Sequence, residues 1–178
     1  MKVKTRTYSG SKSQEVSARE LSNRKVARAA AAEGIVLMKN DGVLPIKKGQ
    51  TAALYGNGVS HFIKGGTGSG DVNEREVVTI QEGLSAAGVT LVNEAAVMAA
   101  PKAYMEAKYA WRDGIIEAIN AAGTGSDMAF FKVLQENPFV EPENVPIIPE
   151  EVSAADVVIY IISRIAGECK DRFDAKGD

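Results

Sequence analysis

One short segment near the carboxyl end of the sequence carries the residues best suited to acid/base chemistry. It runs from Ser163 to Arg172 and contains Glu168, with Arg164 and Asp171 nearby. Two arginines and an acid grouped around one glutamate can hold its geometry and bias its proton affinity, as general acid/base catalysis requires. The same grouping is also typical of a structural ion-pair cluster. The residues alone leave both interpretations open.

A second unusual segment is the glycine-dense run from Lys64 to Asp71, which includes Gly68, Ser69 and Gly70. Because glycines leave the backbone uncovered, its amides could bind an anion or the hydroxyls of a sugar. Just before this run, the dinucleotide fingerprint Gly-x-Gly-x-x-Gly fails because His61 stands where its third glycine should be. The phosphate-loop pattern Gly-Lys-Ser/Thr does not occur either. A tight surface loop without a ligand remains the alternative.

Three apolar runs are expected to form the strands that position these segments: Thr51 to Tyr55, Val89 to Val92 and Val157 to Ile162. The last is apolar throughout and β-branched apart from its tyrosine, which is typical of a central strand covered on both faces. A capping box from Thr79 to Glu82 predicts a helix that Gly88 closes, between the first two strands. Strand, helix and strand together predict a parallel βαβ unit.

Further helices are expected on either side of this unit. The capping box from Ser17 to Glu20 predicts a helix to about Met38, with small side chains facing a sheet, and Asn40-Asp41-Gly42 predicts a turn. A long excursion over residues 94 to about 153 holds two helical patterns, around Tyr104 to Ile119 and Met128 to Gln135. Aromatic residues at helical spacing there are expected in the core, although an aromatic face could also bind a sugar: Tyr104, Tyr109, Trp111, Phe130 and Phe131.

The expected fold is therefore α/β, a mostly parallel sheet with helices on both faces, or three-layer sandwich, with a helical insertion over residues 94 to 153. Residues 1–15 are expected to form a flexible tail and residues 16–178 the domain. About three strands are visible where open sheets have four to six, so we expect the sheet to be incomplete and the domain to continue beyond Asp178. Loops converge at the carboxyl edge of such a sheet, which would bring Glu168 near the glycine segment.

Composition narrows the classes of function. Apolar residues make up 45% and charged residues 25% of the 178-residue chain, as in soluble globular proteins. A formal net charge of -2 with no basic stripe argues against nucleic acid as a partner. No apolar run is long enough to cross a membrane, and the amino end does not resemble a secretory signal. His61 and Cys169 are single, so no metal cluster or internal disulfide is expected, and a cytoplasmic location is predicted.

Three ordered motifs resemble glycoside hydrolase family 3. The segment from Val26 through Ile46 resembles the family's A-x-E-(S/G)-I-V-L-L-K-N-x-x-x-L-P-L pattern. The run Gly65 to Gly70 resembles its Gly-Ser-Gly loop, and Ser163 to Arg172 resembles its S-R-x-x-G-E-G-x-D-R segment, with Cys169 where the family often has glycine. The motifs cover most of the chain apart from the excursion.

This resemblance implies a two-domain enzyme of β-glucosidase type that hydrolyses β-linked glycosides with retention and without a cofactor. A TIM-like barrel, of which this chain shows no motif, would supply the nucleophilic aspartate, and this domain would supply the general acid/base. Carried over by position, Glu168 is that acid/base, with Asp174 as the weaker candidate. The expected substrate-binding residues are Lys64, Gly68, Ser69, Gly70, Arg164 and Arg172.

The early position of the first motif, near Val26, resembles members whose sandwich domain precedes the barrel. The chain alone is then expected to be inactive, and to self-associate through an uncovered strand edge. Two other classes of function stay open: a non-catalytic sugar-binding or docking module built on the glycine loop, and a nucleotide-binding domain.

Overall fold

The computed structural model describes residues 15–63, 77–122 and 127–164. The chain divides into two units, Met1–Leu44 and Pro45–Asp178. The predicted organisation, a tail followed by one domain from residue 16, stays a prediction.

The first unit contains helix α1, Ala18–Gly34. The predicted capping box is present, because the Ser17 hydroxyl accepts a hydrogen bond from the Glu20 amide and the Glu20 carboxylate accepts one from the Ser17 amide. The expected end at Met38 is wrong. The helix stops at Gly34, a weak helix former, and the β-branched Ile35 that follows is extended, with φ -75° and ψ 126°. No residue of α1 is buried, and packing of its small side chains on a sheet stays a prediction.

The predicted turn after this segment is built around one side chain. Asn40 Oδ1 accepts hydrogen bonds from the amides of Gly42 and Leu44, and its Nδ2 donates to the Leu44 carbonyl. Gly42 has φ +98°, a conformation in which other residues are strained. These contacts give Asn40 of the first motif a structural role.

The second unit is built on a parallel three-stranded sheet in the order β2-β1-β3. The strands are β1, Thr51–Tyr55, β2, Thr90–Leu91, and β3, Val157–Tyr160. The parallel βαβ unit is confirmed, since β1 pairs with β2 through Thr51 and Thr90. The same strand pairs with β3 over four residues, from Ala52 opposite Val157 to Tyr55 opposite Tyr160.

The central strand among those described is β1, so the central place predicted for Val157 to Ile162 is wrong. All four residues from Ala52 to Tyr55 are fully buried, whereas Val158 and Tyr160 of β3 are 46% and 56% exposed. A β-branched, apolar sequence predicts a strand, but its place in the sheet depends on which strands pair with it.

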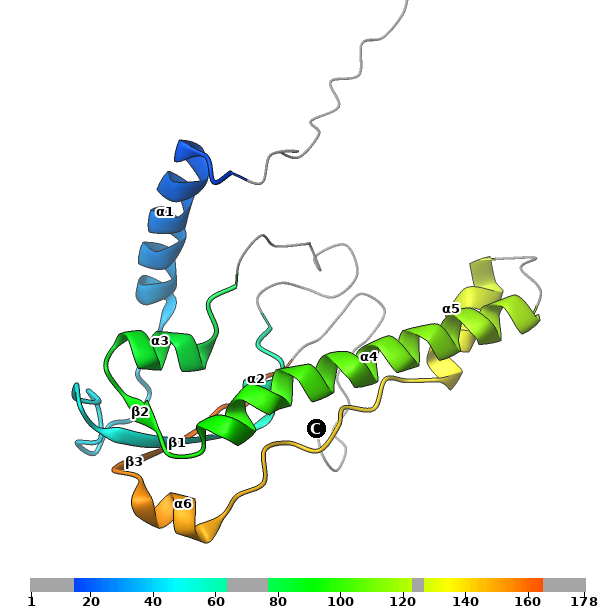
Figure 1. Ribbon diagram of the computed structural model, residues 1–178. Helices are drawn as coiled ribbons and strands as arrows, with labels where there is room; N and C mark the ends of the chain where they lie inside the picture. Colours follow the sequence, from blue (N-terminus) through cyan, green and yellow to red (C-terminus); the bar gives the residue numbers. More distant parts are fainter. Residues whose placement is uncertain (1–14, 64–76, 123–126, 165–178) are drawn as a thin grey trace, which may run out of the picture. The chain divides into compact units, whose positions relative to one another are not determined.

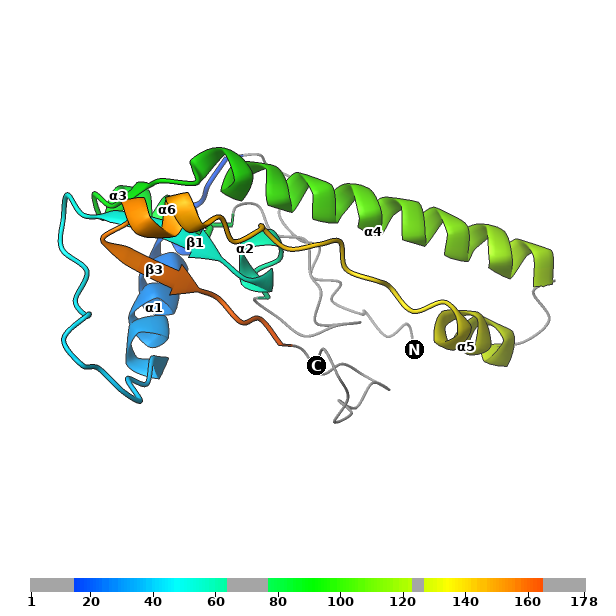
Figure 2. The same ribbon diagram turned by 90° about the horizontal axis from the view of Figure 1, so that it is seen from below.

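Helices cover both faces of the sheet (Figures 1 and 2). Helix α3, Ile80–Ala86, covers one face and α6, Pro149–Ala154, covers the other, while α4, Glu94–Ala122, begins shortly after β2. The capping box of Thr79 and Glu82 opens α3 as predicted, and Gly88, at φ +81°, follows its end. The fold is the expected α/β sandwich.

The excursion is more helical than its sequence suggested. Helix α4 begins ten residues before the predicted pattern and contains Pro101, with helix-favouring alanines on both sides of it. The second predicted helix is α5, Asp127–Glu136. Two elements were not predicted. They are the short α2, Asn57–Ser60, and α6, whose Pro149 and first-turn acids Glu150 and Glu151 are typical of a helix start.

Candidate functional site at the carboxyl edge of the sheet

The two segments that drew attention in the sequence leave neighbouring strands at the same edge of the sheet. Because β1 and β3 are parallel and Tyr55 lies opposite Tyr160, both carboxyl ends meet there. From this edge one chain segment leads through α2 toward Lys64, and the other leads through Ser163 and Arg164 toward Glu168.

Of the expected site residues, only Arg164 lies within the described part of the chain, and it is exposed. The others fall outside it, so the predictions for them stay predictions: Lys64, Gly68, Ser69, Gly70, Glu168, Arg172 and Asp174. The described residues show how the two segments begin.

The chain turns sharply at Gly56, directly after β1. Its φ is +96°, and a Cβ there would collide with the backbone of Ile161. A Cβ on Gly58 would collide with the Ile161 side chain. These glycines let the segment after β1 lie close against the segment after β3, as two backbone hydrogen bonds show: Ile161 N to Tyr55 O at 2.8 Å and Gly58 N to Ile161 O at 3.2 Å.

A side chain extends this pairing by one further step. Asn57 Oδ1 accepts a hydrogen bond from the Ser163 amide at 2.8 Å, and Asn57 Nδ2 donates to the Ser163 carbonyl at 2.6 Å. A carboxamide offers the same donor and acceptor as a peptide group, so it can replace a strand residue in a ladder. No sequence pattern predicted this role for Asn57; an amide side chain between two glycines was the available signal.

The same device occurs on the other side of β1. Asn93 Oδ1 accepts from the Leu54 amide at 3.1 Å, and Asn93 Nδ2 donates to the Leu54 carbonyl at 3.0 Å. Asn93 is 3% exposed and follows β2 after one intervening residue, Val92, so it continues the pairing of β1 with the segment leading into α4. No sequence pattern predicted this role for Asn93 either.

The opposite edge of the sheet is held by a charged group. Asp156 Oδ2 accepts hydrogen bonds from the Thr51 amide at 2.8 Å and the Thr51 hydroxyl at 2.9 Å, and the Asp156 amide donates to that hydroxyl. The bond from the Thr51 amide, and then that from its hydroxyl, hold the pKa of Asp156 below its usual value. The contact joins the amino ends of β1 and β3.

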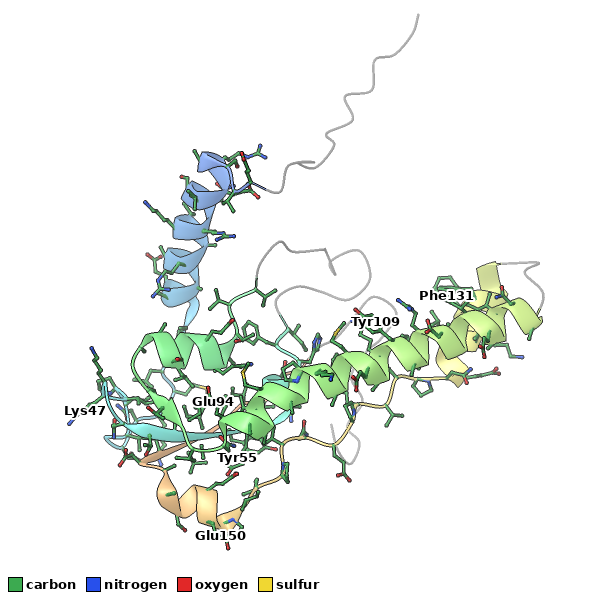
Figure 3. The ribbon with its side chains drawn as sticks, viewed as in Figure 1. Lys47, Tyr55, Glu94, Tyr109, Phe131 and Glu150 are labelled. Atoms are coloured by element: carbon green, nitrogen blue, oxygen red, sulfur yellow. The ribbon has the colours of Figure 1, made fainter. Side chains whose placement is uncertain are left out.

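Tyr55 ties the sheet to α6. Its side chain is fully buried and lies between β1 and α6 (Figure 3). Its hydroxyl donates a 3.0 Å hydrogen bond to the Glu151 carboxylate. Burial, followed by this hydrogen bond and the negative charge of Glu151, raises the pKa of Tyr55. The phenol therefore stays a neutral donor beneath the strand that leads to the site.

The aromatic residues of the excursion divide between core and surface. Tyr104 is 5% exposed and stacks on His61 with ring centroids 4.4 Å apart, and Trp111 donates a hydrogen bond to the Asn137 carbonyl. The core position predicted for Tyr104 is confirmed. The core position is wrong for three others, which are 44% to 49% exposed: Tyr109, Phe130 and Phe131. Figure 3 labels Tyr109 on α4 and Phe131 on α5.

Within the described ranges, no three His, Cys, Asp or Glu side chains gather closely enough to hold a metal ion. None of the helices seen there has the length and apolarity to cross a membrane.

These features define a class of protein: an α/β domain with a small parallel sheet whose carboxyl edge gathers two loop segments. The model of the glycosyl hydrolase family 3 C-terminal domain matches residues 35–178 of the chain. The chain therefore belongs to glycoside hydrolase family 3, as the three motifs predicted.

Named relatives agree with this assignment. Beta-glucosidase A of Butyrivibrio fibrisolvens is 56% identical over 57 residues, which are 32% of this chain and 7% of that protein. A beta-glucosidase of Ruminococcus albus is 32% identical over 144 residues, 79% of this chain and 13% of that protein. The solved structure of beta-glucosidase 3B from Thermotoga neapolitana in complex with alpha-D-glucose matches with a TM-score of 0.57 and 30% identity, over 89% of this chain and 20% of that one. The chain thus spans a fifth or less of the length of each of these relatives.

Proposed function

We propose that this chain is the acid/base-bearing part of a retaining β-glycosidase that hydrolyses β-glucoside-like substrates. Glu168 is the general acid/base, with Asp174 as the alternative. The substrate would be held in part by residues of the two segments at the carboxyl edge of the sheet: Lys64, Gly68, Ser69, Gly70, Arg164 and Arg172.

The chemistry requires two carboxyl groups. In a retaining hydrolysis one carboxylic acid protonates the leaving oxygen while a carboxylate about 5 Å away attacks the sugar carbon, and the first group then activates water. The chain carries a candidate for the first role, and a barrel domain of the same protein would carry the second. On this proposal the chain is inactive alone, needs no cofactor and acts in the cytoplasm.

One observation carries the proposal beyond family membership. β1 and β3 are direct parallel neighbours. Hydrogen bonds also join the segments that follow them, between Tyr55 and Ile161 and between Asn57 and Ser163. The chain therefore leaves the sheet from adjoining positions on its way toward the glycine segment and toward Glu168, which supports a cleft served by both.

The test is the dependence of rate on the leaving group, measured on the full-length protein. Glu168→Gln should lower kcat/KM for alkyl β-glucosides by about 100-fold or more, because they need a proton on the leaving oxygen, and spare a dinitrophenyl β-glucoside in the glycosylation step. Azide should restore turnover of the activated substrate.

Asp174→Asn is the matched control and should leave this dependence unchanged. The opposite pattern would transfer the role to Asp174, and unchanged kinetics in both variants would refute the assignment. Calorimetry of the isolated chain with glucose or cellobiose addresses the non-catalytic alternative, because tight binding without a barrel would favour a sugar-binding module.

A further inference from the structure

We propose that Asn57 is a positioning residue for the acid/base segment, acting through the backbone of Ser163. The inference rests on the proposed function of Glu168, and it assigns to the turn after β1 a task in the reaction.

The pairing of β1 with β3 continues beyond the strands themselves. Four hydrogen bonds hold Ile161 and Ser163: Ile161 N to Tyr55 O, Gly58 N to Ile161 O, and the two bonds of the Asn57 carboxamide to Ser163. After Gly56 the backbone curves into α2, and within that helix Gly58 N makes one more hydrogen bond to the outgoing segment, at Ile161 O. The Asn57 side chain takes the place of a backbone peptide group in the pairing with Ser163.

The local backbone leaves few residue types for this task. The segment after β1 lies so close to Ile161 that a Cβ would collide at both Gly56 and Gly58. The side chain between them must donate to a carbonyl and accept from an amide of the same residue. Asparagine offers both groups at this reach, whereas aspartate lacks the donor and alanine lacks both.

The anchored residue stands five positions before Glu168 in the sequence. General acid catalysis requires the carboxyl group within hydrogen-bond reach of the leaving oxygen, about 2.6 to 3.2 Å. A misplacement of about 1 Å can lower the rate by about 100-fold. Fixing the backbone of Ser163 limits the conformations of the residues that follow it. Loss of the Asn57 hydrogen bonds should therefore displace the Glu168 carboxyl group, and this effect needs no contact between Asn57 and the substrate.

The molecule contains its own control. Asn93 makes the same pair of hydrogen bonds, with Leu54, and is nearly fully buried. Its own segment leads into α4 and not toward Glu168. Removal of either carboxamide eliminates a comparable pair of hydrogen bonds. Of these two asparagines, only Asn57 bonds to the segment that follows β3.

The experiment compares Asn57→Ala and Asn93→Ala in the full-length protein, using β-glucosides whose leaving groups range from dinitrophenol to an alkyl alcohol. For Asn57→Ala we expect kcat/KM to fall by about tenfold or more with the alkyl glucoside and by less than about twofold with the dinitrophenyl glucoside. Asn93→Ala should lower the melting temperature and change kcat/KM by one common factor for all substrates. Should Asn57→Ala not fold, Asn57→Asp, which keeps the size of the side chain but lacks the donor to the Ser163 carbonyl, must show the same steeper dependence.

Glu168→Gln, measured in parallel, separates the two ideas. If Glu168→Gln steepens the dependence while the Asn57 variants lower all rates equally or not at all, the role of Asn57 is refuted and the function stands. If Glu168→Gln leaves the dependence on the leaving group unchanged, the assignment of the acid/base to Glu168 fails, whatever the Asn57 variants show.

Discussion

At Gly56 the chain leaves β1 with φ +96°, and a Cβ would run into the carbonyl group of Ile161. Both the dihedral angle and the close approach exclude a side chain, so this residue permits the pairing on which the candidate site depends. Gly83 differs in both respects: it lies within α3, and an added Cβ would meet nothing within 4 Å.

The two glycines should therefore respond in opposite directions to the same substitution. Gly56→Ala should lower the free energy of unfolding by at least about 2 kcal/mol, because it adds backbone strain and a clash. Gly83→Ala should raise it by about 0.5 to 1 kcal/mol, because alanine favours the helix and restricts the unfolded chain. Urea unfolding of the chain, followed through Trp111, its only tryptophan, measures both. A stable Gly56→Ala variant would contradict the close approach.

At the scale of elements, the pairing of β1 with β3 is fastened at both ends. Asp156 holds the Thr51 amide and hydroxyl where the strands begin, and Asn57 holds Ser163 where they end. β2 adds only two residues to the sheet, and Asn93 extends its pairing. Side-chain contacts thus set the register of a sheet whose strands are short.

The Asp156 contact predicts a pH dependence of stability. Hydrogen bonds from Thr51 lower the pKa of Asp156 below its ordinary 3.8, so the unfolded chain binds this proton more readily than the folded chain. The contact stabilises the fold above the ordinary pKa, and its contribution is lost as pH falls through the lowered value. Asp156→Ala should therefore lower the urea midpoint most near neutral pH, and the difference from the parent should shrink on acidification below about pH 4.

Glu141→Ala is the control for this measurement, since it removes an exposed carboxylate from the segment between α5 and α6. It should leave the midpoint nearly unchanged. A deficit in Asp156→Ala that stays constant at all pH values would show that packing, not the charged contact, had been lost.

At the scale of the whole molecule, the chain is a family 3 C-terminal-type domain that spans a fifth or less of the length of the relatives named above. Within the described residues β3 pairs with β1 alone. Three large apolar side chains on β3 and directly after it are 46% to 65% exposed: Val158, Tyr160 and Ile162. Exposed apolar strands of this kind associate with other chains.

The isolated chain should therefore self-associate, and Val158→Lys should shift it toward the monomer because a charge on an exposed strand opposes pairing. Light scattering over a concentration series measures this. Val140→Lys is the matched control, because Val140 is 78% exposed but lies outside the sheet. A stable monomer of the unaltered chain, or equal effects of the two substitutions, would refute the role of β3.

The sequence by itself determined several of the local elements, the parallel unit and the family, because capping boxes, apolar runs and ordered motifs act over a few residues. Ser17 with Glu20, Thr79 with Glu82 and the run from Thr51 to Tyr55 each appear where expected. The candidate Glu168 came from the sequence and stays a proposal. The tertiary structure alone decided that β1 is the central one of the described strands and that Asn57 and Asn93 extend its pairing. Those facts depend on pairings between residues that are far apart in the sequence, by 39 positions for Leu54 with Asn93 and by 106 positions for Asn57 with Ser163. No local pattern specifies such pairings.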